Sequence, residues 1–443
     1  MSTTDQVVLM PAQDVPVAGE YDVVVCGAGP AGAAAAIAAG RRGRSVLLVD
    51  MQSQVGGLIA SVGMGTFCDS PGGPIFDEMM ARLLALGAAS RRLDPERYYP
   101  PGRHSCHAPT VSAILLEMLR EAGVELLLLT LAEGAWLEDG AVAGAIIVNK
   151  AGRSLARARV VIDCTADADI AASAGTPFRQ GDPRGGWVQH CNSRCGVEGV
   201  DADRLPPPDQ LEALCREAVA TGCLQPPDAL FGLDPECFPF THESGTLALR
   251  GWELQHIDPT DPAQVTEALA QCQLASLQLV RFLRERVPGC ESCRVTHFPA
   301  ALATRESRRI VGGYTLTGED VLAGAKFEDG VVPAWFFIDL HDPAPATVAH
   351  TLQFVQQNRP RPGDWYEIPY RCLVPVKPPG LLVAGRCISC DRPAQGSLRV
   401  IPTCFFLGQA AGTAAARAIE ASVQPHELDG AALKAEIMGE WHP

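Results

Sequence analysis

A glycine-rich turn near the N-terminus constrains the fold of this chain more than any other feature. Residues 27–32 read Gly-Ala-Gly-Pro-Ala-Gly and fit the pattern G-x-G-x-x-G. The turn follows the β-branched run Tyr21–Cys26, and it precedes a helix-forming run at Ala33–Ala39 and a second apolar strand at Ser45–Asp50. This order predicts a βαβ unit in which the turn binds the pyrophosphate of a dinucleotide.

Each glycine of the turn has its own physical reason. We expect Gly27 to permit the tight turn out of the strand, Gly29 to let the backbone approach the pyrophosphate, and Gly32 to let the helix pack closely on the sheet. The helix then offers N–H groups and the positive end of its dipole to the phosphates. Asp50 ends the second strand, where its carboxylate can accept both hydrogens of a ribose diol and would repel a 2′-phosphate.

Two features further along the chain favour FAD over NAD. A Gly56-Gly57 pair follows Asp50, and a second glycine-rich strand–loop–helix closes the chain, with a strand expected at Leu381–Ala384 and a helix at Cys404–Ile419. An NAD domain does not need this last element. A flavin needs it to hold its ring system and ribityl chain beyond the pyrophosphate, so the sequence predicts FAD as the cofactor.

The predicted fold class is α/β, a discontinuous Rossmann-like FAD-binding domain with an inserted mixed α/β substrate domain. The amino-acid composition changes after Gly175, because residues 176–260 are rich in Pro, Gly, Trp and polar side chains. We expect the FAD-binding domain to comprise residues 1–179 and 365–443, and the substrate domain residues 180–364. Further helices and strands are expected at Ile75–Leu86, Thr110–Ala122, Val124–Thr130, Ala135–Leu137, Val142–Asn149, Val160–Cys164, Ala263–Arg286 and Thr347–Gln357.

Charge and hydropathy narrow the range of partners. The chain has 36 basic and 51 acidic side chains, a formal charge of -15, whereas nucleic acids and anionic membranes select basic patches. The first residues lack the pattern of a signal peptide, and no apolar run is long enough to span a bilayer. We therefore expect a cytoplasmic protein that acts on a small-molecule substrate, binds no nucleic acid or membrane, and keeps most of its 16 cysteines as free thiols. Homo-oligomer formation stays open.

Four blocks of the sequence resemble one known family, the FAD-dependent oxidoreductases of the glutathione-reductase-like flavoproteins. The blocks are Val23–Gly57, Val160–Gly175, Thr304–Gly324 together with Phe337–Pro343, and Ile368–Ala416. The second block departs from the family pattern, because Thr165-Ala166-Asp167 stands where Thr-Gly-Asp is usual. The backbone at Ala166 must therefore tolerate a Cβ. The resemblance implies a fold and a cofactor but no substrate.

The resemblance also implies a set of FAD-binding residues. Phosphate and ribose contacts would come from the nucleotide turn and Asp50, and backbone contact with adenine from near Ala132. Gly385 and Arg386 would reach the ribityl–pyrophosphate side, and the loop Arg399–Cys404 would lie beside the pyrimidine edge of the flavin. The full predicted set is Gly27, Ala28, Gly29, Pro30, Ala31, Gly32, Asp50, Met51, Gly56, Gly57, Ala132, Cys164, Thr165, Gly385, Arg386, Arg399 and Thr403.

Asp339-Leu340-His341 is the main candidate for proton transfer. If Trp335–Leu340 is a strand, alternation puts both polar side chains on one face, and the usual pKa of histidine suits a base that titrates near neutrality. The alternative is a capping Asp and a structural His. Arg399 is a candidate ligand of the substrate or flavin, and Tyr370 either lines the pocket or packs in the core.

Charged and sulfur-containing clusters offer further hypotheses. Arg305, Arg308 and Arg309 with Glu306 are interpreted as an internal ion-pair network, although their guanidinium groups could also bind an anion. Two C-x-x-C motifs, at residues 290–293 and 387–390, could hold zinc or an iron–sulfur cluster, or act as a redox dithiol. They lie far apart in the sequence without zinc-ribbon flanks, so no metal is predicted.

The leading functional prediction is a dehydrogenase or oxidase. It would pass a hydride from a C–H next to oxygen or nitrogen to flavin N5, while His341 removes the proton. Three alternatives stay open: reduction of an activated C=C, a flavin–dithiol disulfide reductase, and a non-enzymatic flavin subunit that passes electrons within a complex.

Overall fold

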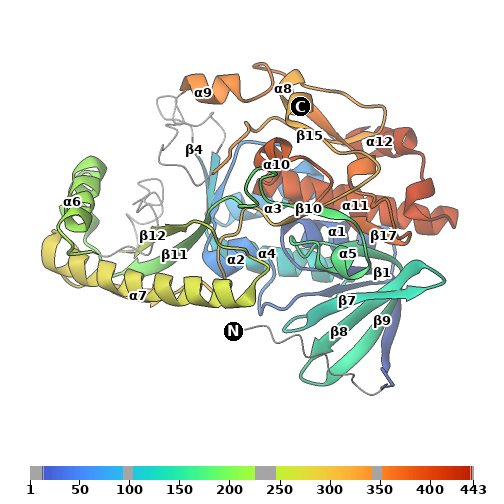
Figure 1. The fold of residues 1–443 in the computed structure, drawn as a ribbon, viewed down its shortest axis with the longest axis horizontal. Coiled ribbons are helices and arrows are strands. Elements are labelled where there is room, and N and C mark those ends of the chain that lie inside the picture. Colours follow the sequence, from blue (N-terminus) through green and yellow to red (C-terminus); the bar gives the residue numbers. More distant parts are fainter. Residues whose placement is uncertain are drawn as a thin grey trace.

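The computed structural model describes residues 12, 14–92, 103–224, 246–341, 352–439 and 441. Its centre is a seven-stranded sheet in the order β6-β2-β1-β9-β8-β7, with β17 also paired to β9 (Figure 1). The strands of this main sheet are β1 (Val17–Cys26), β2 (Val46–Val49), β6 (Glu125–Leu127), β7 (Leu131–Glu138), β8 (Ala141–Asn149), β9 (Gly152–Asp163) and β17 (Leu381–Val383).

The long strand β9 belongs to two kinds of pairing. Its first half pairs antiparallel with β8, from Gly144 opposite Arg157 to Asn149 opposite Gly152. Its second half runs parallel to β1 on one side and to β17 on the other. The strands β6, β2, β1, β9 and β17 therefore form a parallel layer. The V/I/L-rich sequences of β2, β17 and the second halves of β1 and β9 are buried, which suits a sheet covered on both faces, whereas the edge strand β6 is only partly buried.

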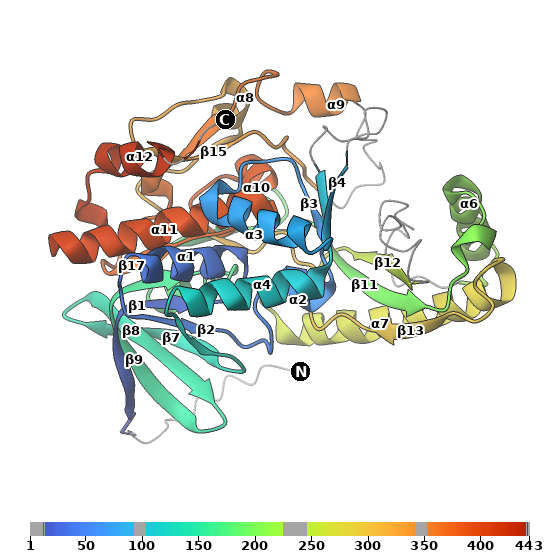
Figure 2. The ribbon, with the colours of Figure 1, turned by 180° about the vertical axis from the view of Figure 1, so that it is seen from behind.

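Two helices rich in small residues pack directly against each other beside the parallel layer (Figure 2). These are α1 (Pro30–Arg41) and α11 (Ile401–Ala421). A Cβ at Gly408 would lie 1.9 Å from the Ala31 carbonyl oxygen, and a Cβ at Gly412 would lie 2.2 Å from the Ala35 carbonyl oxygen. The backbones approach this closely only because both positions are glycine, so the C-terminal helix is fixed against the helix of the nucleotide turn.

The remaining elements surround this layer. Three further helices of the N-terminal part are α2 (Leu58–Val62), α3 (Gly73–Ala85) and α4 (Ala108–Glu121). Small sheets form from β3 (Thr66–Phe67), β5 (Arg103–Cys106) and β4 (Ala89–Arg92), from β10 (Phe178–Gln180) and β14 (Arg308–Ile310), and from β15 (Gly330–Ala334) and β16 (Tyr366–Pro369). The other helices are α5 (Asp169–Ser173), α8 (Gly318–Ala323), α9 (Leu352–Gln357), α10 (Arg392–Leu398) and α12 (Gly430–Gly439).

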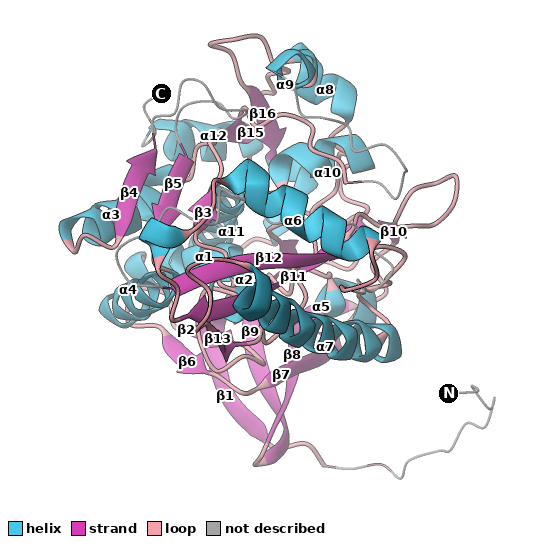
Figure 3. Cartoon of the chain, turned by 90° about the vertical axis from the view of Figure 1, so that its left-hand side faces the viewer, coloured by secondary structure: helices cyan, strands magenta, loops and turns pink. Residues whose placement is uncertain are grey.

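A second hydrophobic cluster forms to one side of the main sheet. It is built by a three-stranded sheet, β12-β11-β13, and two helices, which lie at the left in Figure 1 and face the viewer in Figure 3. Their bounds are β11 (Cys191–Glu198), β12 (Thr246–Leu254), β13 (Arg294–His297), α6 (Pro208–Ala220) and α7 (Pro262–Arg286). The cluster draws its residues from 191–302, whereas Ile310 to Ile338 contribute to the main core. We propose residues 191–302 as the separately packed unit within the predicted substrate domain.

Several predicted elements are confirmed, some with a visible local cause. The helix expected at Ala263–Arg286 is α7, and the Asp261 side chain caps its start by accepting the N–H groups of Ala263 and Gln264. The hairpin, the βαβ unit and the returning strand and helix also form. Of the helix expected at Thr347–Gln357, the structure describes α9, and residues 347–351 lie outside the described residues.

One predicted strand is shorter than expected, and another is wrong. The strand expected at Val124–Thr130 ends at Leu127, because Leu129 has a φ of 52° and a left-handed residue cannot continue a ladder. Trp335–Leu340 is not a strand, since β15 ends at Ala334, where its partner β16 begins at Tyr366 and the ladder stops. The prediction about Asp339 and His341 therefore cannot rest on strand alternation.

Candidate active site

The nucleotide turn lies at the carboxyl edge of the parallel layer. Gly27 follows β1, Asp50 follows β2, Cys164 follows β9 and Gly385 lies just beyond β17. The chain places β2 on one side of β1 and β9 on the other, so the strand order reverses at β1. Open α/β sheets bind their ligands in the crevice at such a reversal, outside the carboxyl ends of the strands.

The three glycines of the turn are required for different reasons. Gly27 has a φ of +99°, and a Cβ there would lie 2.4 Å from the Cys164 carbonyl oxygen. A Cβ at Gly32 would lie 1.7 Å from the Gly27 carbonyl oxygen. At Gly29 the backbone is ordinary, with φ -69° and ψ -174°, and the nearest atom to a Cβ would be Gly57 Cα at 3.9 Å. Neither conformation nor packing requires a glycine at position 29, so the open space in front of it fits a bound pyrophosphate.

Asp50 is tied into the turn by its backbone neighbours. The Ala28 N–H donates to Asp50 Oδ2 at 2.5 Å, and the Gln52 N–H donates to Asp50 Oδ1 at 2.7 Å. Burial raises the pKa of this carboxyl, and the two amide hydrogen bonds oppose the increase. Each oxygen keeps a further lone pair for a ribose hydroxyl. The neighbouring Met51 side chain is 63% exposed, which leaves its predicted contact with the cofactor a prediction.

The turn after β9 adopts the strained conformation that its sequence implies. Ala166 has a φ of 71° and Ala168 a φ of 55°, in the left-handed region that favours glycine. Thr165 anchors the turn, since its N–H and its hydroxyl both donate to Asp163 Oδ1, at 3.0 and 2.7 Å. The Cys164 N–H donates to the Cys26 carbonyl and joins this turn to β1.

Restoring the usual glycine should relieve this strain. We expect Ala166→Gly to raise the free energy of unfolding by about 0.5–1 kcal/mol. The left-handed conformation costs alanine about 1–2 kcal/mol, and glycine removes this cost. Part of the gain is offset because glycine makes the unfolded chain more flexible. Thermal unfolding measures the change. Ala172→Gly, inside α5, is the matched control and should lower stability. A less stable Ala166→Gly protein would mean that the turn is unstrained.

Arg386 offers a buried donor toward the same crevice. Its Nη2 donates to Asp167 Oδ1 at 2.8 Å, while its Nε is buried and has no hydrogen-bond partner among the described residues. Gly385 before it has a φ of +98° and lies beside α1, where its Cβ would be 3.4 Å from the Ala31 Cβ. A buried guanidinium with an unused N–H suits an anionic or carbonyl group of a bound ligand.

Helix α11 begins at the residues predicted to lie beside the flavin. Thr403, in its first turn, is fully buried, and its hydroxyl lies 2.8 Å from the Ser70 hydroxyl. The Cys404 thiol donates to the Arg399 carbonyl at 3.5 Å. The positive end of this long helix suits the negative charge that a reduced flavin carries on its pyrimidine side.

His341, Asp339 and Arg399 come together without the strand that was expected. His341 Nε2 lies 3.1 Å from Asp339 Oδ2, and Arg399 Nη2 donates to the same oxygen at 2.9 Å and to the Asp339 carbonyl at 3.0 Å. Arg399 thus holds Asp339 in place. The sequence predicted Arg399 as a ligand of the substrate or the flavin and did not predict this ion pair. The buried Nε of Arg399 has no hydrogen-bond partner in the part of the chain that the structure describes.

The protonation state of His341 differs from the prediction. The pKa of His341 is lowered to about 4, because burial disfavours the imidazolium and the nearby Arg305 repels it, while Asp339 opposes both effects only in part. The expectation of a pKa near neutrality is therefore wrong. At neutral pH the ring is uncharged, and when Nε2 carries its hydrogen toward Asp339 the lone pair stands on Nδ1.

A buried polar network holds the backbone at His341. The backbone N–H of His341 donates to Gln189 Oε1 at 3.3 Å, and Gln189 Nε2 donates to Gln395 Oε1 at 2.7 Å. Gln395 in turn donates to the Arg305 carbonyl at 2.8 Å. Sequence reasoning missed both glutamines, because a single amide in an irregular segment carries no pattern.

The charged cluster at residues 305–309 forms the internal ion-pair network that was the favoured interpretation. Glu306 is fully buried and binds Arg309, and it accepts from Arg392 Nε at 2.9 Å. Arg308 instead pairs with Asp169 at 2.8 Å. The network joins α10 to the segment that carries Arg305.

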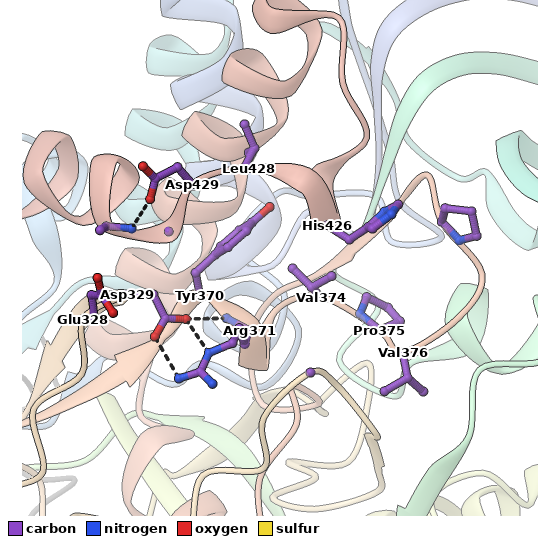
Figure 4. A pocket seen from close by; sticks show the side chains of 14 residues that line it. Glu328, Asp329, Tyr370, Arg371, Val374, Pro375, Val376, His426, Leu428 and Asp429 are labelled. Carbon is purple, nitrogen blue, oxygen red and sulfur yellow. Dashed lines mark hydrogen bonds and ion pairs between the residues drawn. The ribbon is translucent and has the colours of Figure 1, made fainter.

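Two predicted residues have different surroundings from those expected. Ala132 lies inside β7, opposite Ile147, rather than at the end of the preceding strand, and its contact with adenine stays a prediction. The Tyr370 hydroxyl is buried and donates to the Pro425 carbonyl at 2.8 Å, and no contact among the described residues brings it to His341. Figure 4 shows Tyr370 beside a separate cavity of about 680 Å³, next to the Arg371–Asp329 ion pair. Its contacts are those of a core residue.

The second C-x-x-C motif does not form a thiol pair at the flavin side. The Cys387 thiol donates to the Ala384 carbonyl at 3.9 Å and the Cys390 thiol to the Ile388 carbonyl at 3.5 Å. Burial raises the pKa of both thiols, that of Cys390 to about 12. Within the described ranges no group of three or more His, Cys, Asp or Glu side chains is arranged to hold a metal ion. No helix there has the length and hydropathy to cross a bilayer.

Comparison with known proteins connects this geometry to one family. The sequence model of the family described as FAD dependent oxidoreductase matches residues 22–437. A thiamine thiazole synthase of Aeropyrum pernix is 31% identical over 130 residues, which are 28% of this chain and 43% of that protein. A digeranylgeranylglycerophospholipid reductase of Methanopyrus kandleri is 33% identical over 151 residues, 32% of this chain and 39% of that protein. The matched segments thus span less than half the length of each of these two curated relatives.

A solved structure is similar over most of the chain. It is a geranylgeranyl bacteriochlorophyll reductase-like protein of Thermoplasma acidophilum, 16% identical, with a TM-score of 0.48 over 95% of this chain and 84% of that one.

Proposed function

Because the chain belongs to the FAD-dependent oxidoreductase family, we propose that it oxidises a small polar substrate at a carbon bonded to oxygen or nitrogen. The observation that carries this proposal is the neutral, oriented histidine. A base must be unprotonated at working pH and fixed in direction, and His341 with Asp339 and Arg399 meets both conditions.

The chain's own residues would hold the cofactor and the proton. FAD supplies the hydride acceptor when it is bound. The open space at Gly29 would admit its pyrophosphate, Asp50 would bind its ribose, and the buried Arg386 Nε would donate to its linker. His341 Nδ1 would take the proton from the substrate O–H or N–H, and Asp339 would stabilise the imidazolium that results.

Reduction of an activated C=C is the second candidate. One relative is a reductase by name, and hydride transfer at a flavin is reversible in principle. A neutral His341 with a pKa of about 4 suits this direction less well, because it would have to donate a proton rather than accept one. A disulfide reductase is disfavoured, since Cys387 and Cys390 are bonded to separate carbonyls and their pKa values are raised.

A substrate panel tests the direction of the reaction. Anaerobic mixing of the yellow enzyme with primary alcohols, secondary alcohols and amines is expected to bleach the visible absorbance of the oxidised flavin for at least one class. Enzyme that no member of the panel bleaches, but that is reoxidised by enoates after chemical reduction, would replace the proposal with the reductase. A charge-transfer band after two-electron reduction would replace it with the dithiol mechanism.

We also propose where this enzyme acts and what it binds. It would be a cytoplasmic protein that acts on a small-molecule substrate, binds no nucleic acid and can form a homo-oligomer. A position among the glutathione-reductase-like flavoproteins rests on the Gly56-Gly57 pair and the returning strand β17.

A further inference from the structure

The first C-x-x-C motif, Cys290-Glu291-Ser292-Cys293, forms a β-turn between α7 and β13. The Cys293 N–H donates to the Cys290 carbonyl at 3.0 Å, which closes the turn. The first and last Cα atoms of a β-turn lie within about 7 Å of each other, and a disulfide needs Cα atoms about 4.4–6.8 Å apart. The backbone therefore already meets the distance requirement for a disulfide bond.

The two side chains also interact with each other. Both thiols are buried in the second hydrophobic cluster, where the Cys293 thiol donates to the Val280 carbonyl at 3.9 Å. Cys290 interacts electrostatically with Cys293 and with Cys215 of α6. The two residues between them, Glu291 and Ser292, are exposed. The pair thus lies directly beneath an exposed turn, and a reagent reaches the two buried sulfur atoms only when this turn opens.

The two thiols differ in how readily they ionise. The pKa of Cys293 is lowered because the Cys290 thiol donates a hydrogen bond to its sulfur and the positive charge of Arg284 is near. The pKa of Cys290 is raised, chiefly because that hydrogen bond binds its proton. Since the thiolate is the nucleophile, Cys293 is the sulfur that reacts first.

We propose that Cys290 and Cys293 form a reversible dithiol–disulfide site that exchanges with small disulfides such as oxidised glutathione. Cys293 thiolate attacks one sulfur of the small disulfide, breaks its S–S bond and releases one thiolate. Cys290, after losing its proton, attacks the Cys293 sulfur, forms the Cys290–Cys293 bond and expels the second thiolate. The Cys290 proton and the proton that Cys293 released to water on ionising are taken up by the two expelled thiolates, so one disulfide is reduced for each one formed. This site rests on no part of the proposed function.

Tryptic mass spectrometry of the full-length, FAD-loaded protein tests the site. After incubation with oxidised glutathione, the remaining thiols are alkylated in denaturant before digestion. Cleavage after arginine gives residues 287–294 with both cysteines of the pair, 387–399 with Cys387 and Cys390, and 205–216 with Cys215. We expect peptide 287–294 to be unalkylated and two hydrogens lighter, and dithiothreitol to reverse this. Peptide 387–399 is the matched control and should be alkylated at both cysteines.

Two results would overturn the proposal. One is full alkylation of peptide 287–294 after treatment, and the other is its cross-link to peptide 205–216, which would make Cys215 the partner. Single variants check the order of attack. Cys290→Ser should accumulate glutathione on Cys293, whereas Cys293→Ser should leave Cys290 unmodified, and the reverse pattern would contradict the assigned roles.

Discussion

Replacing Gly29 with valine is expected to leave a folded protein that no longer retains FAD. The structure has room for the new side chain, because the nearest atom to a Cβ at this position is 3.9 Å away and the backbone angles suit any residue. The valine methyl groups would instead occupy the space in which the pyrophosphate meets the backbone N–H groups. Losing two such charge-assisted hydrogen bonds, at about 1.5–3 kcal/mol each, weakens binding by at least roughly 100-fold.

The measurement is the flavin absorbance of the purified protein, followed by titration of the apoprotein with FAD. The ligand released from wild-type protein on denaturation should be FAD, not FMN. Cys390→Ser is the control: Cys390 is buried but lies outside the cofactor pattern, so this variant should stay yellow. Thermal unfolding of both apoproteins shows whether they fold. A yellow Gly29→Val protein would mean that the turn does not bind the pyrophosphate.

Replacing His341 with alanine is expected to preserve FAD binding and to slow flavin reduction by roughly 10²–10⁴-fold, the usual contribution of a positioned acid–base group. The contacts of His341 involve Asp339 and Gln189 rather than the nucleotide turn, so the loss should appear in the reduction rate and not in cofactor content. Stopped-flow measurements with a substrate from the panel give this rate. An unchanged rate would make His341 a structural residue.

The pH dependence of the same rate gives a second, independent readout. The pKa of His341 is lowered to about 4, so the neutral base is present above that pH and is lost as the pH falls through it. Wild-type reduction should therefore rise with pH through about 4 and stay level across neutrality. The free energy of unfolding should also fall as the pH is lowered. In the unfolded chain this histidine has a pKa of about 6.5, so between that pH and the lower pKa of the folded state only the unfolded chain binds the proton, and acid destabilises the fold.

His341→Gln is the control for packing, since it keeps a polar side chain of similar length but cannot take up a proton at these pH values. In this variant flavin reduction should be slow, and its rate should no longer rise with pH near 4. A limb that persists in His341→Gln would assign the titration to another group, with Asp339 the first to test.

The parts of the fold that follow from local pattern were predictable from the sequence. Short sequence patterns predict the turn at residues 27–32, the strand that ends in Asp50 and the helix capped by Asp261. The helix α10 did not, because its seven residues include Pro393 and Gly396 and carry no amphipathic repeat. The strand expected around Leu129 failed because a single left-handed residue interrupts an otherwise favourable apolar run.

The site was harder to predict because tertiary contacts create its chemistry. Asp339 and His341 meet through a loop conformation that the strand hypothesis did not contain. The low pKa of His341 depends first on burial and then on Arg305, which a distant stretch of the sequence supplies. Gln189 is recognisable only from what it touches. Residue type and spacing identified the histidine, but not its charge.

The double pairing of β9 has a consequence for how the chain is made. Residues 161–163 pair with β1 on one side early, but they gain their second parallel neighbour only from residues 381–383, which leave the ribosome long after the rest of the sheet. Until then the growing chain carries an apolar strand with one unsatisfied edge, the kind of surface that pairs with other chains. Because β17 is made late, Gly385 and Arg386 also reach the crevice long after the nucleotide turn. Translation that stops before this segment should yield aggregating, colourless fragments, and flavin colour should mark a finished chain.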